Sequence, residues 1–584
     1  MLTNAIVAGV MASLYLLIVL LQLNPQVPLA SMTVVRWFGA LLAHYGPLLI
    51  AVVYVLILVR EAVSPRPLRP AWLSVRVLAW LSAFGAAAAA YMTWANLGGF
   101  AALLGESAAE RMRQGATAST VVAAVLMVVA VLRYSFGRRG TRLTSVVLFV
   151  SLAASVVVPL WWRGPGDVPV PAVIRTIAAP PPKEDAPHVR LILLDGASLD
   201  FIRGRVAAGQ LPNFGRILDY GAAMDLATVK PTQAVPVWAA AMTGKYPAKN
   251  GVRSDAVYRV TPDDDNPVSL LPDYCFAQSL VYEGFVRADA QLTSSSLHAR
   301  TLWDILTDYA IASGITNLPL TRPAHVDRGY IVSDSFDEAT QDPLRLADRQ
   351  AAYPTAAVDT GRDVFDAWQA RPWSDAIAKV SPGEEAPIGV QTAVWDHAYS
   401  DTASILDQEF APRLTAVRYE GLNTFGKWYL QDAEPERFGQ IGGGDRARSI
   451  LDRYYTYIDV EVGRVINDLS PNDLLVVVSG FGMEEVAWPK RVLARLLGRS
   501  DPNGGHERAP DGFLIAYGTN VARGRFPRGA IVDVAPTVLY YMGLPIGRDM
   551  DGYARTDLFW PGFALAHTLK FIGTHEHRIA AADR

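Results

Sequence analysis

The sequence contains a single cysteine, Cys275, among its 584 residues. One thiol cannot form an intramolecular disulfide, and it excludes a zinc site built from several cysteines. Charged residues are also scarce, at 19% of the chain, and 53 lysines and arginines against 56 aspartates and glutamates leave a net charge of −3. This near balance excludes a generally basic nucleic-acid-binding protein, so we expect no nucleic-acid partner.

Hydrophobic residues make up 51% of the chain, and the excess lies before Pro165. A membrane-spanning helix needs about 20 mostly apolar residues. Five stretches approach that length: Ala5–Leu23, Phe38–Val59, Leu78–Leu97, Val121–Leu132 with its lead-in, and Ser145–Trp162. We therefore predict an all-α bundle of five transmembrane helices over residues 1–163, with the lipid bilayer as its partner.

Arginines are concentrated in two of the connections between these stretches. The connection after the second stretch carries Arg60, Arg66, Arg69 and Arg76, and the one after the fourth carries Arg133, Arg138, Arg139 and Arg142. Because lysine and arginine are retained on the cytoplasmic side, we expect the amino terminus in the cytoplasm. Five crossings then place the rest of the chain outside, in the periplasm of a bacterial-type inner or plasma membrane.

Residues 164–187 are rich in proline and lack a periodic apolar pattern, which is typical of a semi-extended linker. Beyond it, Val189–Leu194 and Leu474–Val478 have the composition of buried parallel strands. Strands separated by helical stretches predict an α/β domain over residues 188–560, followed by a C-terminal tail over 561–584. Asp195 follows the first strand, where such sheets bind ligands, although a helix-capping carboxylate fits that position equally well.

An unusual string of residues follows this strand: Lys230–Trp238 (KPTQAVPVW), Thr243–Pro247 (TGKYP) and Asn250–Val252 (NGV). Together with Asp195 and the LPN sequence at 211–213, it resembles the alkaline phosphatase superfamily, specifically its type I phosphodiesterase/nucleotide pyrophosphatase branch. The resemblance extends from about Val189 to about Leu558. It implies an alkaline-phosphatase-like α/β domain with a mostly parallel central sheet and helices on both faces.

The resemblance also implies two divalent metals, usually zinc, held over a threonine or serine nucleophile. Paired dications lower the pKa of the nucleophile and neutralise the charge of the phosphoryl transition state. Asp195 matches the ligand after the first strand, and His506 matches the late histidine ligand. Thr232 is the candidate nucleophile by its hydroxyl, but counting back from Thr243 puts the family's nucleophile on Ala234. Either the turn is wound differently and Thr232 serves, or the chain has no nucleophile.

Four further ligand positions of the family carry other residues in this chain. Arg418–Lys427 matches a YEGxDxxxH motif, with Asn423 in place of its aspartate and Lys427 in place of its histidine. In the SDHGM turn, Gly480 and Phe481 replace both ligands. Glycine and phenylalanine have no donor side chain and a protonated lysine repels a cation, so we expect one metal or none rather than a conventional pair.

Asn423 and Lys427 are therefore candidate ligand-binding residues. Two unit charges about 4 Å apart attract by roughly 4 kcal/mol at an effective dielectric of 20, so a lysine near a lost metal position can hold a phosphate. It cannot reproduce the activation of a nucleophile by a dication.

Three functions stay open. The first is a membrane-anchored, extracytoplasmic phosphodiesterase-like protein that binds a phosphorylated ligand, such as a lipid or its headgroup, at a degenerate site. The second is an active phosphoester hydrolase or lipid-directed phospho-headgroup transferase that uses Thr232, by analogy with phosphoethanolamine transferases and lipoteichoic acid synthases. The third is a membrane assembly or export component with a recognition domain. The altered ligand positions favour the first.

Overall fold

The computed structural model describes residues 2–63, 75–135, 142–166, 175–260, 263–272, 285–340, 350–377, 384–439, 449–498, 502–506 and 509–579. Part of the predicted linker, the end of the predicted tail, Cys275, and Arg66, Arg69, Arg138 and Arg139 of the orientation argument lie outside these ranges. The chain forms two compact units, one of Met1–Ala172 with Ala256–Gln291 and the other of Val173–Asp255 with Leu292–Arg584. Each is described separately.

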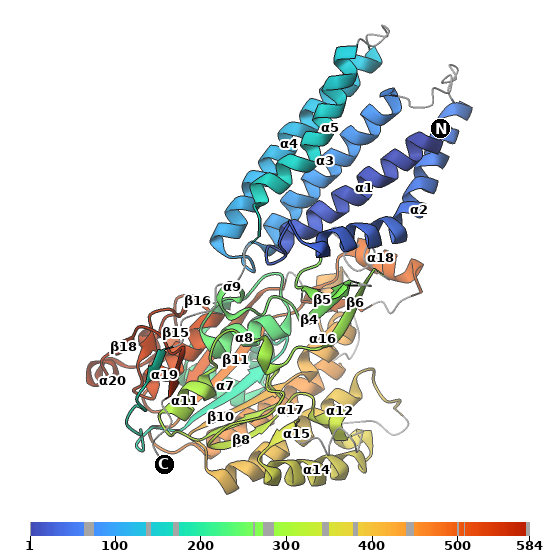
Figure 1. The fold of residues 1–584 in the computed structure, drawn as a ribbon. Helices are drawn as coiled ribbons and strands as arrows, with labels where there is room; N and C mark the ends of the chain where they lie inside the picture. The colour runs from blue at the N-terminus through green and yellow to red at the C-terminus, as the bar shows by residue number, and fades with distance from the viewer. Residues whose placement is uncertain are drawn as a thin grey trace. The chain divides into compact units, whose positions relative to one another are not determined.

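Each of the five apolar stretches forms a helix of the first unit (Figure 1). The helices are α1 (Leu2–Leu23), α2 (Met32–Val63), α3 (Val75–Phe100), α4 (Glu106–Ser135) and α5 (Arg142–Arg163). Within the described ranges, three are long and apolar enough to cross a membrane: α1, α2 and residues Glu106–Leu132 of α4. The prediction of apolar helices is confirmed, whereas the number of five membrane spans stays a prediction.

A three-stranded sheet also belongs to the first unit. Its strands are β4 (Ala256–Val260), β5 (Asp263–Val268) and β6 (Val286–Gln291). Val260, Val268 and Phe285 pack with Leu17 and Leu20 of α1 and with Trp37 and Leu41 of α2 in one buried cluster. Residues 256–291, which the sequence analysis assigned to the α/β domain, thus fold with the apolar helices.

The side chain of Asn24, at the end of α1, fixes this sheet to the helix. Its amide nitrogen donates to the carbonyls of Leu20 and Leu270, both at 2.9 Å. Its oxygen accepts from the backbone N–H groups of Ser269 at 2.9 Å and Leu270 at 3.2 Å. Because Asn24 is fully buried, these bonds satisfy groups that would otherwise be costly to desolvate.

The second unit is built on a mixed sheet that joins ten strands among the described residues. Its centre is parallel, in the order β11 (Leu474–Phe481), β2 (Val189–Leu194), β10 (Leu414–Tyr419), β7 (Ser313–Thr316) and β8 (Gly329–Val332). Antiparallel pairs extend it through β14 (Asp511–Tyr517) and β3 (Ala222–Ala227) at one side and β9 (Ala352–Tyr353) at the other, and β15 (Gly524–Arg525) and β16 (Gly529–Ala530) run parallel to β3. The α/β prediction is confirmed, with a larger antiparallel share than expected.

The register of the central strands determines which residues meet at the sheet edge. Leu194 of β2 lies opposite Tyr419 of β10 and Ser479 of β11. Asp195 and Glu420 therefore follow β2 and β10, and Gly480 lies near the end of β11 at the same carboxyl edge, the position where α/β sheets bind ligands.

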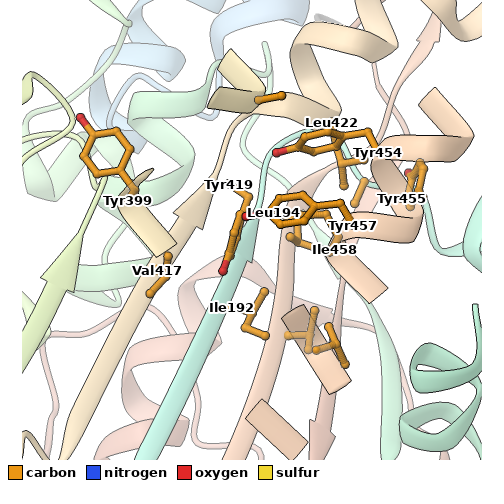
Figure 2. Packing of buried hydrophobic residues seen from close by; sticks show 14 of the residues in the cluster. Ile192, Leu194, Tyr399, Val417, Tyr419, Leu422, Tyr454, Tyr455, Tyr457 and Ile458 are labelled. Carbon is orange, nitrogen blue, oxygen red and sulfur yellow. The ribbon is translucent and has the colours of Figure 1, made fainter. Parts of the chain in front are cut away.

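Helices cover both faces of this sheet. One face carries a large core that includes α6 (Leu199–Ala207), α7 (Pro212–Tyr220), α12 (Phe336–Thr340), α14 (Thr355–Gln369), α15 (Val390–Phe410), α16 (Gly421–Ala433) and α17 (Ile450–Asn467). Figure 2 shows Ile192 and Leu194 of β2 beside Tyr419 of β10 and Tyr457 and Ile458 of α17. Alternate residues of β2 point to the other face of the sheet. Helices outside the large core include α8 (Ala234–Thr243), α11 (Leu302–Asp308) and α19 (Val534–Tyr541).

The segment predicted as a C-terminal tail contributes further elements. They are α20 (Pro561–Ala566), β18 (Phe571–Ile572) and β19 (His577–Ile579). β18 pairs with β17 (Ile546–Gly547), and β19 pairs with β1 (Arg175–Ile177). The carboxylate of Glu576 also accepts a hydrogen bond from buried Lys245 at 2.8 Å. The described part of the tail is therefore folded onto the second unit.

Candidate functional site

Asp195 follows β2 and is completely buried. One of its oxygens, Oδ1, accepts a hydrogen bond from the indole Nε1 of Trp238 on α8 at 2.6 Å. The other, Oδ2, accepts from Nη2 of Arg418 on β10 at 2.6 Å and from its Nε at 3.1 Å. Both oxygens of the carboxylate are therefore bonded to nitrogen donors of the chain itself.

Arg418 is the cation of this arrangement, and it is buried with Asp195. Burial disfavours its charge, but Asp195 and then Glu420 outweigh that effect and raise the pKa of the guanidinium well above its usual value. The same side chain donates to Glu420 Oε1 at 3.0 Å and to the Asn317 carbonyl at 3.3 Å. A buried ion pair needs such additional bonds, because desolvation of two charges is costly.

His506 contacts the turn that carries Thr232. The hydroxyl of Thr232 is buried and has no hydrogen-bond partner among the described residues. Nδ1 of His506 lies 2.9 Å from the Thr232 carbonyl. Burial, and next the charge of Lys427, lower the pKa of His506, so the neutral ring donates Nδ1–H to that carbonyl. Its Nε2 is then unprotonated.

The turn that carries Thr232 is held by Asp255. Oδ1 of Asp255 accepts from the backbone N–H of Val235 at 2.9 Å, and its own N–H donates to Oε1 of Gln233 at 2.8 Å. Burial raises the pKa of Asp255. Ala234, at the first position of α8, has no side chain for chemistry.

Asn423 and Lys427 lie one turn apart on α16, so their side chains share a face of the helix. Oδ1 of Asn423 is buried without a partner among the described residues. Lys427 is partly exposed and close enough to His506 to affect its pKa. A Cβ on Gly196 would lie 3.0 Å from Cα of Asn423, so the first turn of α16 packs against the end of β2.

The start of α16 is fixed by Asp396 of α15. Its carboxylate accepts from the backbone N–H groups of Glu420 at 2.9 Å and Gly421 at 2.8 Å, and from the Tyr454 hydroxyl. Burial raises the pKa of Asp396 to about 7. Asp396 thus positions the helix that presents Asn423 and Lys427 to the site.

The positions of Gly480 and Phe481 are filled by apolar packing. A Cβ on Gly480 would lie 2.4 Å from Cγ1 of Val237 and 3.6 Å from Cζ2 of Trp238. The Phe481 ring is buried, and its centroid lies 4.9 Å from that of the His506 ring. Gly480 therefore has no room for a ligand side chain without rearrangement, and position 481 is occupied by a ring without a donor atom.

The residues present do not match the donor set that two dications require. Both oxygens of Asp195 are engaged, Nδ1 of His506 is engaged, and Gly480 and Phe481 offer no donor. In the part of the chain that the structure describes, no group of three or more histidines, cysteines, aspartates or glutamates is placed to hold a metal ion. We therefore derive no chemical step through a metal.

Two contributors to the site were missed by the sequence analysis. Arg418 was noticed only as part of a motif, and Trp238 only as an apolar residue of the 230–238 string. Trp238 is buried, and its indole N–H donates a hydrogen bond to Asp195. An arginine as the penultimate residue of a strand beside β2 was the available signal, because residues at that edge meet Asp195 once the strands are paired.

A group of carboxylates lies beside Arg418. Burial raises the pKa of Asp337 to about 7, with contributions from Glu338, Glu420 and Asp334, and it raises that of Asp334 to about 6. A carboxyl group whose folded pKa exceeds its unfolded value stabilises the fold fully only below the unfolded pKa. That stability is lost as pH rises through the folded pKa.

Replacing Asp337 by asparagine should therefore stabilise the protein more at high pH than at low pH. We expect the unfolding free energy of Asp337→Asn, relative to the parent protein, to increase between pH 5 and pH 8, the window around the folded pKa of about 7. Chemical denaturation of the full chain in detergent measures this. Asp363→Asn, at an exposed position of α14, is the control. A difference in unfolding free energy between Asp337→Asn and the parent protein that does not change with pH would contradict the prediction.

Three comparisons with known proteins bear on the second unit. The model of the family described as type I phosphodiesterase/nucleotide pyrophosphatase matches residues 189–526. The search of curated proteins found no match. Among solved structures, a mutant of alkaline phosphatase PafA is similar, with 11% identity, a TM-score of 0.41, and coverage of 66% of this chain and 100% of that one. The family model matches more than half of the chain, which therefore belongs to the type I phosphodiesterase/nucleotide pyrophosphatase family of the alkaline phosphatase superfamily.

Proposed function

We propose that this protein binds a phosphorylated ligand at the Thr232, Asn423, Lys427 and His506 site without hydrolysing it through a two-metal centre. The observation that carries the proposal is the engagement of Asp195. Its two oxygens, which would face a metal in the family, accept hydrogen bonds from Trp238 and Arg418 instead. A permanent guanidinium supplies the positive charge that balances this carboxylate.

Lys427 supplies a charge that is open to a ligand. Among the described residues it has no carboxylate partner, and its contribution to the lowered pKa of His506 supports a position near that ring. A lysine about 4 Å from a phosphate attracts it by roughly 4 kcal/mol at an effective dielectric of 20. Thr232 and Asn423 add buried polar atoms that lack partners, and such atoms are expected to be satisfied by a ligand or by water.

The apolar helices favour a ligand found at a membrane. Among the described residues, three helices are both long and apolar enough to span a bilayer, and we propose that α3 and α5 also cross it. The arginine-rich connections then put the amino terminus in the cytoplasm and the α/β domain in the periplasm. A phosphorylated lipid or its headgroup is the ligand class that this anchoring favours.

Binding of bis(p-nitrophenyl) phosphate to the full chain in detergent tests the proposal by calorimetry. We expect saturable binding that Lys427→Ala weakens by about tenfold or more, since one charge contact of 1.4 kcal/mol corresponds to tenfold. Lys570→Ala, at an exposed lysine, should bind as the parent does. Equal affinity in both variants, or no binding, would contradict the proposal.

Metal content and turnover of the same preparation distinguish the active-enzyme alternative. We expect no stoichiometric zinc and no release of p-nitrophenol above background. Stoichiometric zinc together with turnover that Thr232→Ala abolishes would replace the proposal by a hydrolase or transferase that uses Thr232.

A further inference from the structure

No residue of helix α18 (Trp488–Leu496) is fully buried in the protein. Its large apolar side chains are unusually exposed: the exposed fractions are 73% for Trp488, 42% for Val492 and 78% for Leu496, with 44% for the adjacent Leu497. Large apolar residues exposed together on a short helix indicate an interaction surface.

The sequence of α18 divides it into an apolar and a basic half. Trp488, Val492 and Leu496 recur every four residues and therefore follow one stripe of the helix. Leu493 and Leu497 widen the stripe. Lys490, Arg491 and Arg495 occupy the opposite half, and residues 488–498 contain no acidic side chain. Tryptophan and leucine on one face with lysine and arginine on the other is the pattern of helices that lie in a membrane interface.

The segment bearing α18 is anchored to the candidate site at its base. The short strands β12 (Glu484–Glu485) and β13 (Gly504–Gly505) pair before and after it. The side chain of Asn503 donates to the Trp428 carbonyl of α16 at 2.8 Å. A Cβ on Gly504 would lie 2.2 Å from the Gly426 carbonyl oxygen, so β13 packs directly on the α16 backbone.

We propose that α18 is an interfacial membrane helix that docks on an anionic phospholipid bilayer. Three features favour a bilayer as the occupant: most of the apolar stripe is exposed, the basic half is complementary to anionic headgroups, and the same chain carries helices that are long and apolar enough to span a membrane. An apolar stripe buried at the headgroup boundary and basic side chains facing the phosphates satisfy both halves at once.

Docking of α18 also indicates the class of ligand, an inference that rests on the proposed function. β13 runs directly into His506, and α16 carries Lys427. A docked α18 would therefore hold the site near the headgroups, so that a lipid-borne phosphodiester could reach it. This deepens the proposed ligand class from a phosphorylated molecule to a membrane phospholipid.

Site-specific labelling tests the docking. With Cys275→Ser as background, Val492→Cys is labelled with an environment-sensitive fluorophore in the full chain. The matched control is Val460→Cys at an exposed valine of α17, 58% exposed. We expect quenching by spin-labelled lipid at position 492 in phosphatidylcholine–phosphatidylglycerol nanodiscs, less in pure phosphatidylcholine, and none at position 460. Reversing Arg491 and Arg495 to glutamate should weaken docking by on the order of fivefold per residue.

The other possible occupants give different results. Protection of position 492 from an aqueous quencher without quenching by spin-labelled lipid would show that the apolar helices of this chain or a second copy cover α18, and it would overturn the proposal. A water-exposed label in every preparation would also overturn it.

A second readout separates this inference from the proposed function. Trp488→Ala with Leu496→Ala should abolish binding of a lipid-borne phosphodiester while soluble bis(p-nitrophenyl) phosphate still binds. Loss of both ligands would contradict the role of α18 in presenting lipid. If the parent protein bound neither ligand, the proposed function would fail while the labelling result at position 492 would still decide the docking.

Discussion

Replacing Arg418 with alanine is expected to lower the unfolding free energy by about 3–5 kcal/mol, the cost of leaving one partner of a buried ion pair unpaired. Asp195 would keep only the hydrogen bond from Trp238, and its charge would stay buried without the guanidinium. Chemical denaturation of the full chain in detergent, followed by intrinsic fluorescence, measures the change.

Two further variants make this result specific. Arg437→Ala removes an exposed ion pair with Glu434 and should cost at most about 1 kcal/mol. Asp195→Asn combined with Arg418→Ala should recover part of the loss, because a buried amide needs no counter-charge and the two residues are in contact. A double variant as unstable as the sum of the single variants would contradict the ion-pair interpretation.

The positions of the motifs at the ends of strands could be predicted from the sequence. Asp195 and Gly480 each follow a short apolar run, and parallel strands bring their carboxyl ends to one edge. The partners of Asp195 were not predictable in this way. The contact with Arg418 depends on the pairing of β10 with β2, and that with Trp238 depends on the packing of α8, both of which are set by tertiary structure.

The unit to which residues 256–291 belong could not be predicted from the sequence. The motif string ends at Val252, and the apolar residues that follow, such as Val260 and Val268, are too few to reveal which core they join. In the structure they pack with Leu17 and Trp37 of the apolar helices. A three-stranded sheet has no internal signal for its partner, because period-two alternation identifies a buried face but not the surface that covers it.

The second large expected effect is on stability, and it follows from the tight packing of Val237 against Gly480. Restoring the family's carboxylate with Gly480→Asp should destabilise the protein by more than Gly480→Ala, which is itself expected to cost about 1–3 kcal/mol by overpacking. The new Cβ would lie 2.4 Å from Cγ1 of Val237, a β-branched side chain that is fully buried and has little freedom to move. The aspartate adds a buried charge to this clash.

Gly482 provides the matched control for this position. A Cβ there would meet Pro510 only at ordinary contact distance, 3.5 Å, so Gly482→Ala should change the unfolding free energy little. Zinc content then tests whether the engagement of Asp195 prevents a metal pair from binding. Gly480→Asp with Phe481→His should still bind no stoichiometric zinc, because Arg418 and Trp238 keep both oxygens of Asp195 engaged. Stoichiometric zinc in that variant with Arg418 intact would show that the two replaced ligands alone, and not the engagement of Asp195, exclude the metal.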